Sequence, residues 1–161
     1  MTARDPDLAA LIDRQQLQDT VLKFATAVDT LDMALYRSIF AEEAEFDFSS
    51  FSGLPASIVA IDDWIAGIDG FLRGFDATQH LMSNFVIEVA GDAAIVTVQA
   101  QAEHALANSG GDGTVSLGGH YIFRLARRPE GWKITACRLT VGWHRGNREL
   151  YALAGAGPPR R

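Results

Sequence analysis

The stretch Ile95-Val96-Thr97-Val98-Gln99-Ala100-Gln101-Ala102-Glu103-His104 decides the fold class. Its even-numbered residues are apolar as far as the final histidine, and all of its odd-numbered residues after the first are polar. A period of two is typical of a β-strand with one buried face. The same alternation, interrupted by turn-forming Gly, Asp and Pro residues, predicts four strands over residues 78–90, 93–107, 114–127 and 132–143.

The chain before these strands has mainly helical periodicity. Apolar residues recur at helical spacing from Leu8 to Val28, after a start at Asp5-Pro6, which predicts a long first helix ending near Asp29. A strand is expected over residues 44–51, because that stretch alternates and is rich in Phe. Shorter elements complete the expectation: helices over residues 33–40 and from 62 or 63 to about 74, a loop over residues 52–55, and a helical turn over residues 147–153.

Helices followed by hairpin-linked strands favour the α+β class, with a curved antiparallel sheet wrapped around the N-terminal helices. A sheet bent in this way forms a cone with an internal pocket for a small ligand. A length of 161 residues fits one domain. We expect the cone domain over residues 1–154 and a loose tail over residues 155–161, which contains Pro158-Pro159.

Composition and charge exclude several classes of function. Fourteen Lys and Arg residues against twenty Asp and Glu residues give a net charge of −6, which disfavours nucleic acid or an anionic membrane as partner. Cys137 is the single cysteine, so neither an internal disulfide nor a thiolate metal cluster can form. The N-terminal residues lack the apolar core of a signal peptide, and no stretch approaches the ~20 apolar residues that span a bilayer. A cytoplasmic location is therefore expected.

His104 is a candidate functional residue, because the alternation places its side chain on the apolar, inward face of its strand. Ala100 and Ala102, on the same face, leave space beside it. Taken alone, His104 is better explained as a core histidine that hydrogen-bonds a backbone carbonyl. His80, near the start of the preceding strand, and Asp29, at the end of the first helix, are equally ambiguous when each is considered alone.

Together these three residues form a chemically useful set. A carboxylate that accepts a hydrogen bond from histidine Nδ1–H fixes the tautomer, leaves Nε2 free as a general base and stabilises the imidazolium formed later. Imidazole titrates near neutral pH, which suits that role. The side chains of Asp29, His80 and His104 are also of the types that bind a metal ion, which is the alternative use of the same set.

The order of motifs along the chain resembles a known superfamily. The chain contains, in this order, Ala27-Val28-Asp29, Tyr36-Arg37-Ser38-Ile39-Phe40, Ala44-Glu45-Phe46-Asp47, Thr78-Gln79-His80 and Gly131-Trp132-Lys133-Ile134. This pattern is similar to the SnoaL-like branch of the nuclear-transport-factor-2-like superfamily, over about residues 11–143. The resemblance implies an α+β cone and leaves the activity open, because the superfamily contains dehydratases, isomerases, cyclases, hydrolases and non-enzymes.

Two enzyme families of this superfamily imply roles for individual residues. Asp29 and His80 match the Asp–His pair of scytalone dehydratase and hexachlorocyclohexane dehydrochlorinase, in which the histidine removes a proton from carbon and the aspartate holds it. His104 matches a second pocket histidine of scytalone dehydratase. Arg138 lies near an arginine that the dehydrochlorinase uses beside its leaving group, at an offset of one residue. The resemblance also favours chemistry without a metal or another cofactor.

The chain departs from both families on the side of the pocket that would polarise a substrate. Val28 and Phe48 stand where scytalone dehydratase has tyrosines, and Phe24 stands where the dehydrochlorinase has a lysine. Neither family's own substrate is therefore expected. These three positions are still expected to contact a substrate, and the candidates for polar lining are Tyr36, Asn84 and Arg138.

The expected function is that of a lyase, with dehydratase-type elimination, or of an isomerase acting on a small, mostly apolar molecule. His80 would be the base, Asp29 its positioning partner and His104 a donor of a proton or hydrogen bond. Two alternatives stay open: a non-catalytic binding or assembly module of the same fold, and a small structural subunit of an oxygenase. A homodimer or homotrimer is expected by analogy with the fold.

Overall fold

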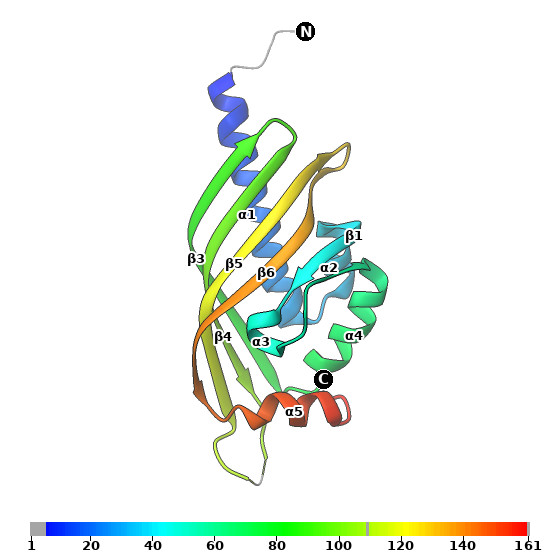
Figure 1. Ribbon diagram of the computed structural model, residues 1–161, viewed down its shortest axis with the longest axis vertical. Helices are drawn as coiled ribbons and strands as arrows, with labels where there is room; N and C mark the ends of the chain where they lie inside the picture. The colour runs from blue at the N-terminus through cyan, green and yellow to red at the C-terminus, as the bar shows by residue number, and fades with distance from the viewer. Residues whose placement is uncertain (1–5, 109, 161) are drawn as a thin grey trace.

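The computed structural model describes residues 6–108 and 110–160, and its central feature is a six-stranded sheet (Figure 1). The strand order is β2-β1-β6-β5-β4-β3, and neighbours pair antiparallel except β1 and β6, which pair in parallel. The elements are α1 (Pro6–Thr30), α2 (Met33–Ile39), β1 (Phe40–Asp47), α3 (Ser49–Ser52), β2 (Ser57–Ala60), α4 (Ile61–Arg73), β3 (Ala77–Ala90), β4 (Ala93–Ala105), β5 (Thr114–Arg128), β6 (Gly131–Gly146) and α5 (Glu149–Ala156). None of the helices in the described ranges is both long enough and apolar enough to cross a membrane.

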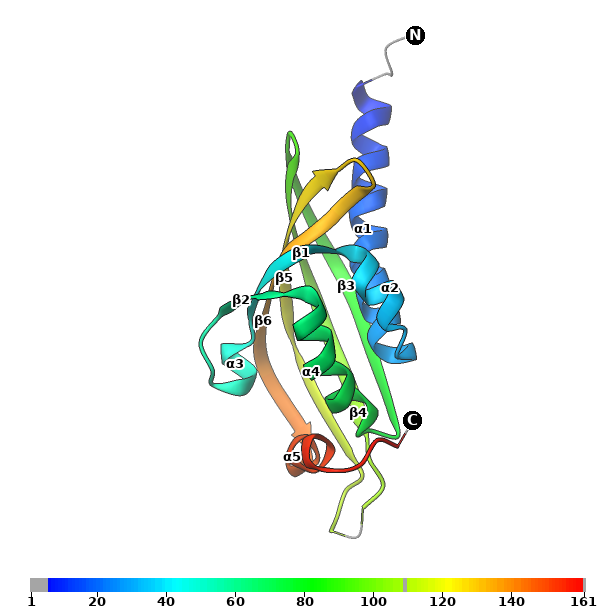
Figure 2. The same ribbon diagram turned by 90° about the vertical axis from the view of Figure 1, so that its right-hand side faces the viewer.

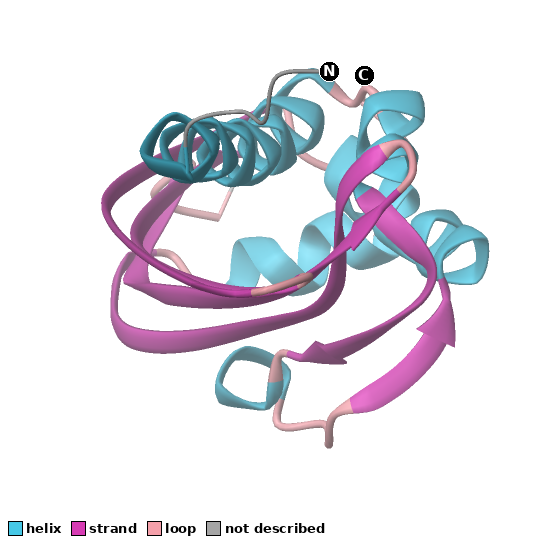
Figure 3. Cartoon of the chain, turned by 90° about the horizontal axis from the view of Figure 1, so that it is seen from above, coloured by secondary structure: helices cyan, strands magenta, loops and turns pink. Residues whose placement is uncertain are grey.

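The long strands bend around an interior that helices close (Figure 2, Figure 3). α1 packs against β3 at one edge of the sheet, and α4 packs against β1 and β2 near the other edge. α5 lies across the lower end of the sheet in Figure 1. This arrangement confirms the predicted α+β fold, in which a curved sheet surrounds the helices. The sheet was expected to be antiparallel throughout, and the parallel pairing of β1 with β6 is the exception.

The residues of β4 that alternate between apolar and polar in the sequence also alternate between buried and less buried in the structure. Its inward residues from Val96 to His104 are each at most 7 % exposed, and the residues between them are less buried. The same interior is filled by apolar side chains of other elements, among them Leu17, Val21, Tyr36, Phe40, Phe123 and Ile134. Full burial of each such side chain stabilises the fold by about 1.5–3 kcal/mol. The face of β4 that carries His104 is therefore the core face.

The strand expected over residues 44–51 lies four residues earlier, as β1 over Phe40–Asp47. Asp47 ends the strand, because its carboxylate accepts hydrogen bonds from the backbone N–H (3.2 Å) and the hydroxyl (2.7 Å) of Ser49 and so turns the chain. The short helix α3 follows, and Gly53 closes it in the left-handed conformation at a φ of 74°. The prediction of a strand that continues through Phe48 was therefore wrong.

Strand β2 was not predicted from the sequence. Its four residues, Ser57–Ala60, pair with β1, and a segment this short shows too little alternation to be recognised. Phe40, expected to end the second helix, is instead the first residue of β1. α4 begins at Ile61, directly after β2 and one or two residues before the predicted start at 62 or 63.

The C-terminal helix is longer than predicted. α5 ends at Ala156, so it includes two residues that the sequence pattern assigned to the tail. Beyond the helix, Arg160 donates its backbone N–H to the carbonyl oxygen of Arg73 (2.7 Å) and its guanidinium to the carboxylate of Asp76 (3.2 Å). α5 also packs closely on the residue that follows α4, since a Cβ added to Gly74 would lie 2.2 Å from the carbonyl oxygen of Ala154. The described part of the tail is thus attached to α4 and to the residue before β3.

Candidate functional site

The last turn of α1 and the first residues of β3 form the polar centre of the site. Asp29 Oδ1 lies 2.7 Å from His80 Nδ1 and accepts a hydrogen bond from the Thr78 hydroxyl (3.1 Å). The other oxygen, Oδ2, accepts a hydrogen bond from the backbone N–H of His80 at 2.7 Å. The packing of α1 on β3 brings Asp29 and His80 together although they are 51 positions apart in the sequence.

These hydrogen bonds favour the ionised form of Asp29 and select the tautomer of the neutral His80 ring. Burial alone would raise the pKa of Asp29, but the hydrogen bonds and charge of His80, with the Thr78 hydroxyl, outweigh burial and hold that pKa below its ordinary value. An ionised carboxylate can only accept a hydrogen bond, so Nδ1 of His80 is the donor. In the neutral imidazole Nε2 then carries no proton, and the ring lines a cavity with 7 % of its side chain exposed.

His104 lies next to His80 on the neighbouring strand. Their ring centroids are 5.7 Å apart, because Thr78 and His80 of β3 pair with His104 and Ala102 of β4. The structure thus brings Asp29, His80 and His104 to one region, in a row of neighbouring side chains. In the described part of the chain, no group of three His, Cys, Asp or Glu side chains is arranged to hold a metal ion.

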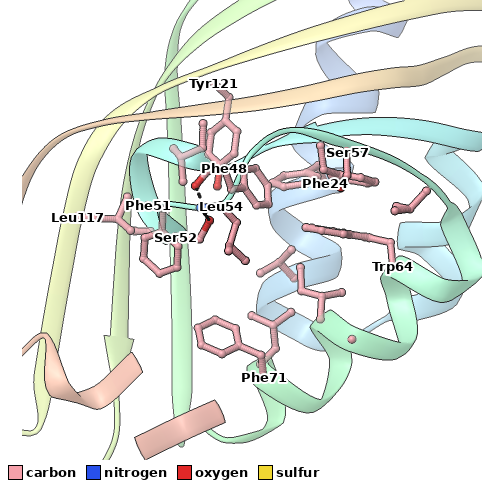
Figure 4. Close-up of a pocket in the computed structure, with 18 of the residues that line it drawn as sticks. Phe24, Phe48, Phe51, Ser52, Leu54, Ser57, Trp64, Phe71, Leu117 and Tyr121 are labelled. Atoms are coloured by element: carbon pink, nitrogen blue, oxygen red, sulfur yellow. Dashed lines mark hydrogen bonds between the residues drawn. The ribbon is translucent and has the colours of Figure 1, made fainter. Parts of the chain in front are cut away.

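Both histidines line a cavity of about 510 Å³. Figure 4 shows much of its aromatic wall. Its wall is mainly apolar, and a large part of it is aromatic, which suits a small apolar ligand. Most aromatic side chains of the wall come from α1, β1, α3 and α4 and from the residue between β1 and α3: Phe24, Phe46, Phe48, Phe51, Trp64 and Phe71.

The predicted apolar contact residues lie at this cavity, and one predicted polar residue lies behind it. Phe24, Val28 and Phe48 all line the wall. Tyr36 is fully buried in the core, where its hydroxyl accepts a hydrogen bond from Trp64 Nε1–H at 3.1 Å. Since Trp64 lines the cavity, Tyr36 supports the wall from behind.

Asn84 and Arg138 lie outside the cavity, contrary to the prediction. Asn84 is exposed, with a φ of 54°, where the pairing of β3 with β4 is irregular. Arg138 is on the outer face of β6, with its Nε 2.8 Å from Asp47 Oδ2. The next residue, Leu139, lines the cavity. Successive side chains of a strand face opposite sides, so an offset of one residue places Arg138 outside.

Tyr121 lines the cavity and was not among the predicted site residues. It belongs to the inward face of β5, whose alternation of Leu117, Gly119, Tyr121 and Phe123 was available in the sequence. A tyrosine on a predicted inward face is the signal that would have identified it.

Comparison with known proteins assigns the chain to a family. The model of the SnoaL-like domain matches residues 9–138. The chain belongs to the SnoaL-like family. One curated relative of this SnoaL-like protein is the uncharacterized protein Rv2910c of Mycobacterium tuberculosis, which is 26 % identical over 129 residues, or 79 % of this chain and 84 % of the relative.

Solved structures share the fold of this SnoaL-like protein. Kfla4162 from Kribbella flavida has a TM-score of 0.84 and 24 % identity, covering 91 % of this chain and 99 % of that one. A type 2 hexachlorocyclohexane dehydrochlorinase has a TM-score of 0.74 and 18 % identity, covering 86 % and 91 %. A scytalone dehydratase-like protein of Novosphingobium aromaticivorans has a TM-score of 0.73 and 18 % identity, covering 86 % and 90 %. These likenesses confirm the predicted resemblance at the level of the fold.

Proposed function

We propose that this SnoaL-like protein is an enzyme in which His80 is a general base toward a C–H bond of a small, mostly apolar molecule. The observation that carries the proposal is the 2.7 Å separation between His80 Nδ1 and Asp29 Oδ1. A carboxylate in this position orients the imidazole and stabilises the imidazolium that forms after proton transfer. General-base catalysis of this kind contributes roughly 10²–10⁴ to the rate.

The reaction belongs to the lyase or isomerase class. The proton passes from substrate carbon to His80 Nε2, and the electron pair left on carbon either expels a leaving group from the neighbouring carbon or is reprotonated at a different carbon. His104 donates a hydrogen bond or proton to the departing hydroxyl or to a developing enolate oxygen. Two solved neighbours are named as a dehydrochlorinase and a scytalone dehydratase-like protein, which favours elimination over isomerisation.

The cavity supports the choice of ligand class. Its wall is largely aromatic and aliphatic, and the described lining residues include no Lys or Arg. An anionic substrate would lose its hydration there without gaining a cationic partner. A neutral molecule with a large apolar surface fits this environment.

Proton abstraction can be tested without knowing the natural substrate. In D₂O, the purified protein is incubated with 1-tetralone, a bicyclic ketone, and deuterium at the carbon next to the carbonyl is followed by NMR. We expect incorporation above the buffer rate with the wild type, and a fall of about 10²–10⁴-fold with His80→Ala. His120→Ala is the matched control, because His120 pairs with Gln99 on the outer face of the sheet.

Elimination is tested with 3-hydroxy-1-tetralone, whose dehydration gives the fluorescent product 1-naphthol. Formation of 1-naphthol that depends on His80 would support a dehydratase-type lyase, whereas deuterium exchange without it would favour an isomerase. Exchange at the buffer rate, together with measurable ketone binding, would contradict catalysis and favour the non-catalytic binding module.

A further inference from the structure

We infer that the Tyr121 hydroxyl binds an oxygen atom of the ligand, so that the molecule taken by the cavity is an apolar ring compound with a carbonyl or hydroxyl oxygen. The assignment of Tyr121 rests on the proposed function only in so far as the bound molecule is taken to be the substrate. Tyr121 comes from β5, on the part of the wall formed by the sheet (Figure 4).

The ring of Tyr121 is held firmly by its neighbours. Its centroid lies 5.4 Å from that of Phe24 in an edge contact, 5.4 Å from that of Phe123 in a stacked contact, and 6.3 Å from that of Phe48. The residue as a whole is 5 % exposed. The hydroxyl therefore has a fixed position and is suited to bind a ligand without reordering.

The hydroxyl has no hydrogen-bond partner in the described part of the chain, although it belongs to a buried residue that lines the cavity. The other buried tyrosine, Tyr36, differs, because its hydroxyl accepts a hydrogen bond from Trp64. A hydroxyl that reaches a cavity without a hydrogen-bond partner from the described chain can bind a ligand or water there. A ligand oxygen in the cavity would complete the hydrogen bonding of Tyr121.

The electrostatic surroundings keep this group a donor. Burial raises the pKa of Tyr121, and the nearby Cys137, Tyr151 and Asp29 side chains raise it further. The hydroxyl consequently retains its proton near neutral pH. A neutral donor in an apolar wall suits a carbonyl or hydroxyl oxygen, and also an enolate oxygen formed after proton abstraction.

Tyr121 and His80 reach the cavity from different strands of the sheet. His80 pairs with Ala102 of β4, and Ala102 pairs with Leu117 of β5. Tyr121 is four residues beyond Leu117, or about 13 Å along the strand. The backbone of Tyr121 is therefore displaced from that of His80 both across and along the sheet, and the side chains of both residues line the cavity.

Other polar side chains of the wall are less suited to this role. The Ser52 hydroxyl already donates to the carbonyl oxygen of Phe48 (3.0 Å) and accepts from the N–H of Leu54 (3.1 Å). Ser57 and Asp63 are exposed to solvent. Among the described residues, Tyr121 thus combines burial, a fixed ring and a hydroxyl available to the cavity.

The test compares two probes with the same skeleton, 1-tetralone and tetralin, which differ by the carbonyl oxygen. Their dissociation constants are measured by calorimetry for the wild type, Tyr121→Phe and Tyr151→Phe. Loss of one neutral hydrogen bond weakens binding about fivefold, so we expect this change for 1-tetralone with Tyr121→Phe and no weakening for tetralin. Tyr151→Phe is the matched control, since Tyr151 is not part of the cavity wall, and it should leave both constants unchanged.

Three results would overturn the assignment: equal weakening of both probes by Tyr121→Phe, no weakening of either, or no binding of 1-tetralone to the wild type. Circular dichroism and thermal unfolding establish that the variant is folded, which we expect because the ring is retained. His80→Ala separates the two proposals. The His80→Ala substitution should abolish deuterium exchange, while the affinity for 1-tetralone still depends on Tyr121. If the wild type binds 1-tetralone through Tyr121 but shows no exchange, the assignment of Tyr121 stands and the proposed catalysis is rejected.

Discussion

Asp29 holds His80 through two hydrogen bonds of 2.7 Å, one from the backbone N–H and one from the ring Nδ1. The two oxygens of one carboxylate thus fix both the start of β3 and the orientation of the imidazole. Neither oxygen can be replaced by a hydrogen-bond donor without loss, because each of them accepts a hydrogen bond from His80.

Asp29→Asn is expected to reduce activity while the chain still folds. The amide keeps one acceptor oxygen and puts an NH₂ group where the other was, so either the backbone N–H or the ring of His80 loses its partner. Deuterium exchange of 1-tetralone should fall about 10²–10⁴-fold. Asp32→Asn is the control, because Asp32 caps α2 through the N–H of Leu35 (2.9 Å), a role that Asn fills equally well. A wild-type rate in Asp29→Asn would contradict the assigned role of the carboxylate.

The same carboxylate predicts a pH-dependent part of the stability. Its pKa in the folded state is below the ordinary value of 3.8, so the folded state favours the ionised form. This contribution is fully present above that value and is lost as the pH falls through the folded-state pKa. The difference in free energy of unfolding between the wild type and Asp29→Asn, measured in urea from pH 7 to about pH 2.5, should therefore shrink at the acid end. If the difference in free energy of unfolding stays constant over this pH range, ionised Asp29 does not contribute to stability as expected.

Filling the cavity should separate ligand binding from stability. Ala102 lines the cavity next to His80 and His104, so Ala102→Leu extends into empty space and should weaken 1-tetralone binding about tenfold or more. Ala100, two residues along the same face, belongs to the packed core and does not line the cavity. Ala100→Leu should instead destabilise the fold by about 1–3 kcal/mol. Calorimetry and urea unfolding of both variants test the contrast, and equal destabilisation by the two substitutions would disprove it.

The packing of α5 on the end of α4 predicts opposite effects for two neighbouring glycines. An added Cβ at Gly74 would lie 2.2 Å from the carbonyl oxygen of Ala154, whereas at Gly70, inside α4, it would meet no atom within 4 Å. Gly74→Ala should destabilise the protein by about 1–3 kcal/mol, because backbone must move. Gly70→Ala should stabilise it by about 0.5–1 kcal/mol through better helix propensity. Thermal unfolding measures both, and two changes of the same sign would refute the expected contact.

The sequence predicts the fold best where one local rule acts over many residues. Alternation over residues 95–104 is long enough to identify β4 and to place His104 inside. The structural break after β1 depends instead on one side chain, since Asp47 hydrogen-bonds Ser49 and interrupts an alternation that continues in the sequence to Phe48. Local chemistry of a single residue can thus override a pattern.

The site was harder to predict, because it depends on contacts between distant segments. Nothing in the local sequence requires Asp29 and His80 to meet, and only the packing of α1 on β3 brings them together. The error at Arg138 has a local cause. A shift of one position along a strand moves a side chain from the inner face of the sheet to the outer face. Tyr121 lies on an alternating inward face of its strand, but no local motif distinguishes it from the core residues beside it.

The parallel pairing of β1 with β6 has a consequence for how the protein is made. β1 and β2 join the sheet only through β6, the last strand of the chain to be synthesised. During translation, β3, β4 and β5 can associate as they emerge, while β1 and β2 can pair only with each other until β6 has left the ribosome. Phe46 and Val59, which belong to the cavity wall, lie on β1 and β2. Ligand binding is therefore a late event in the life of a nascent chain, and a translation pause before β6 would leave the cavity unformed.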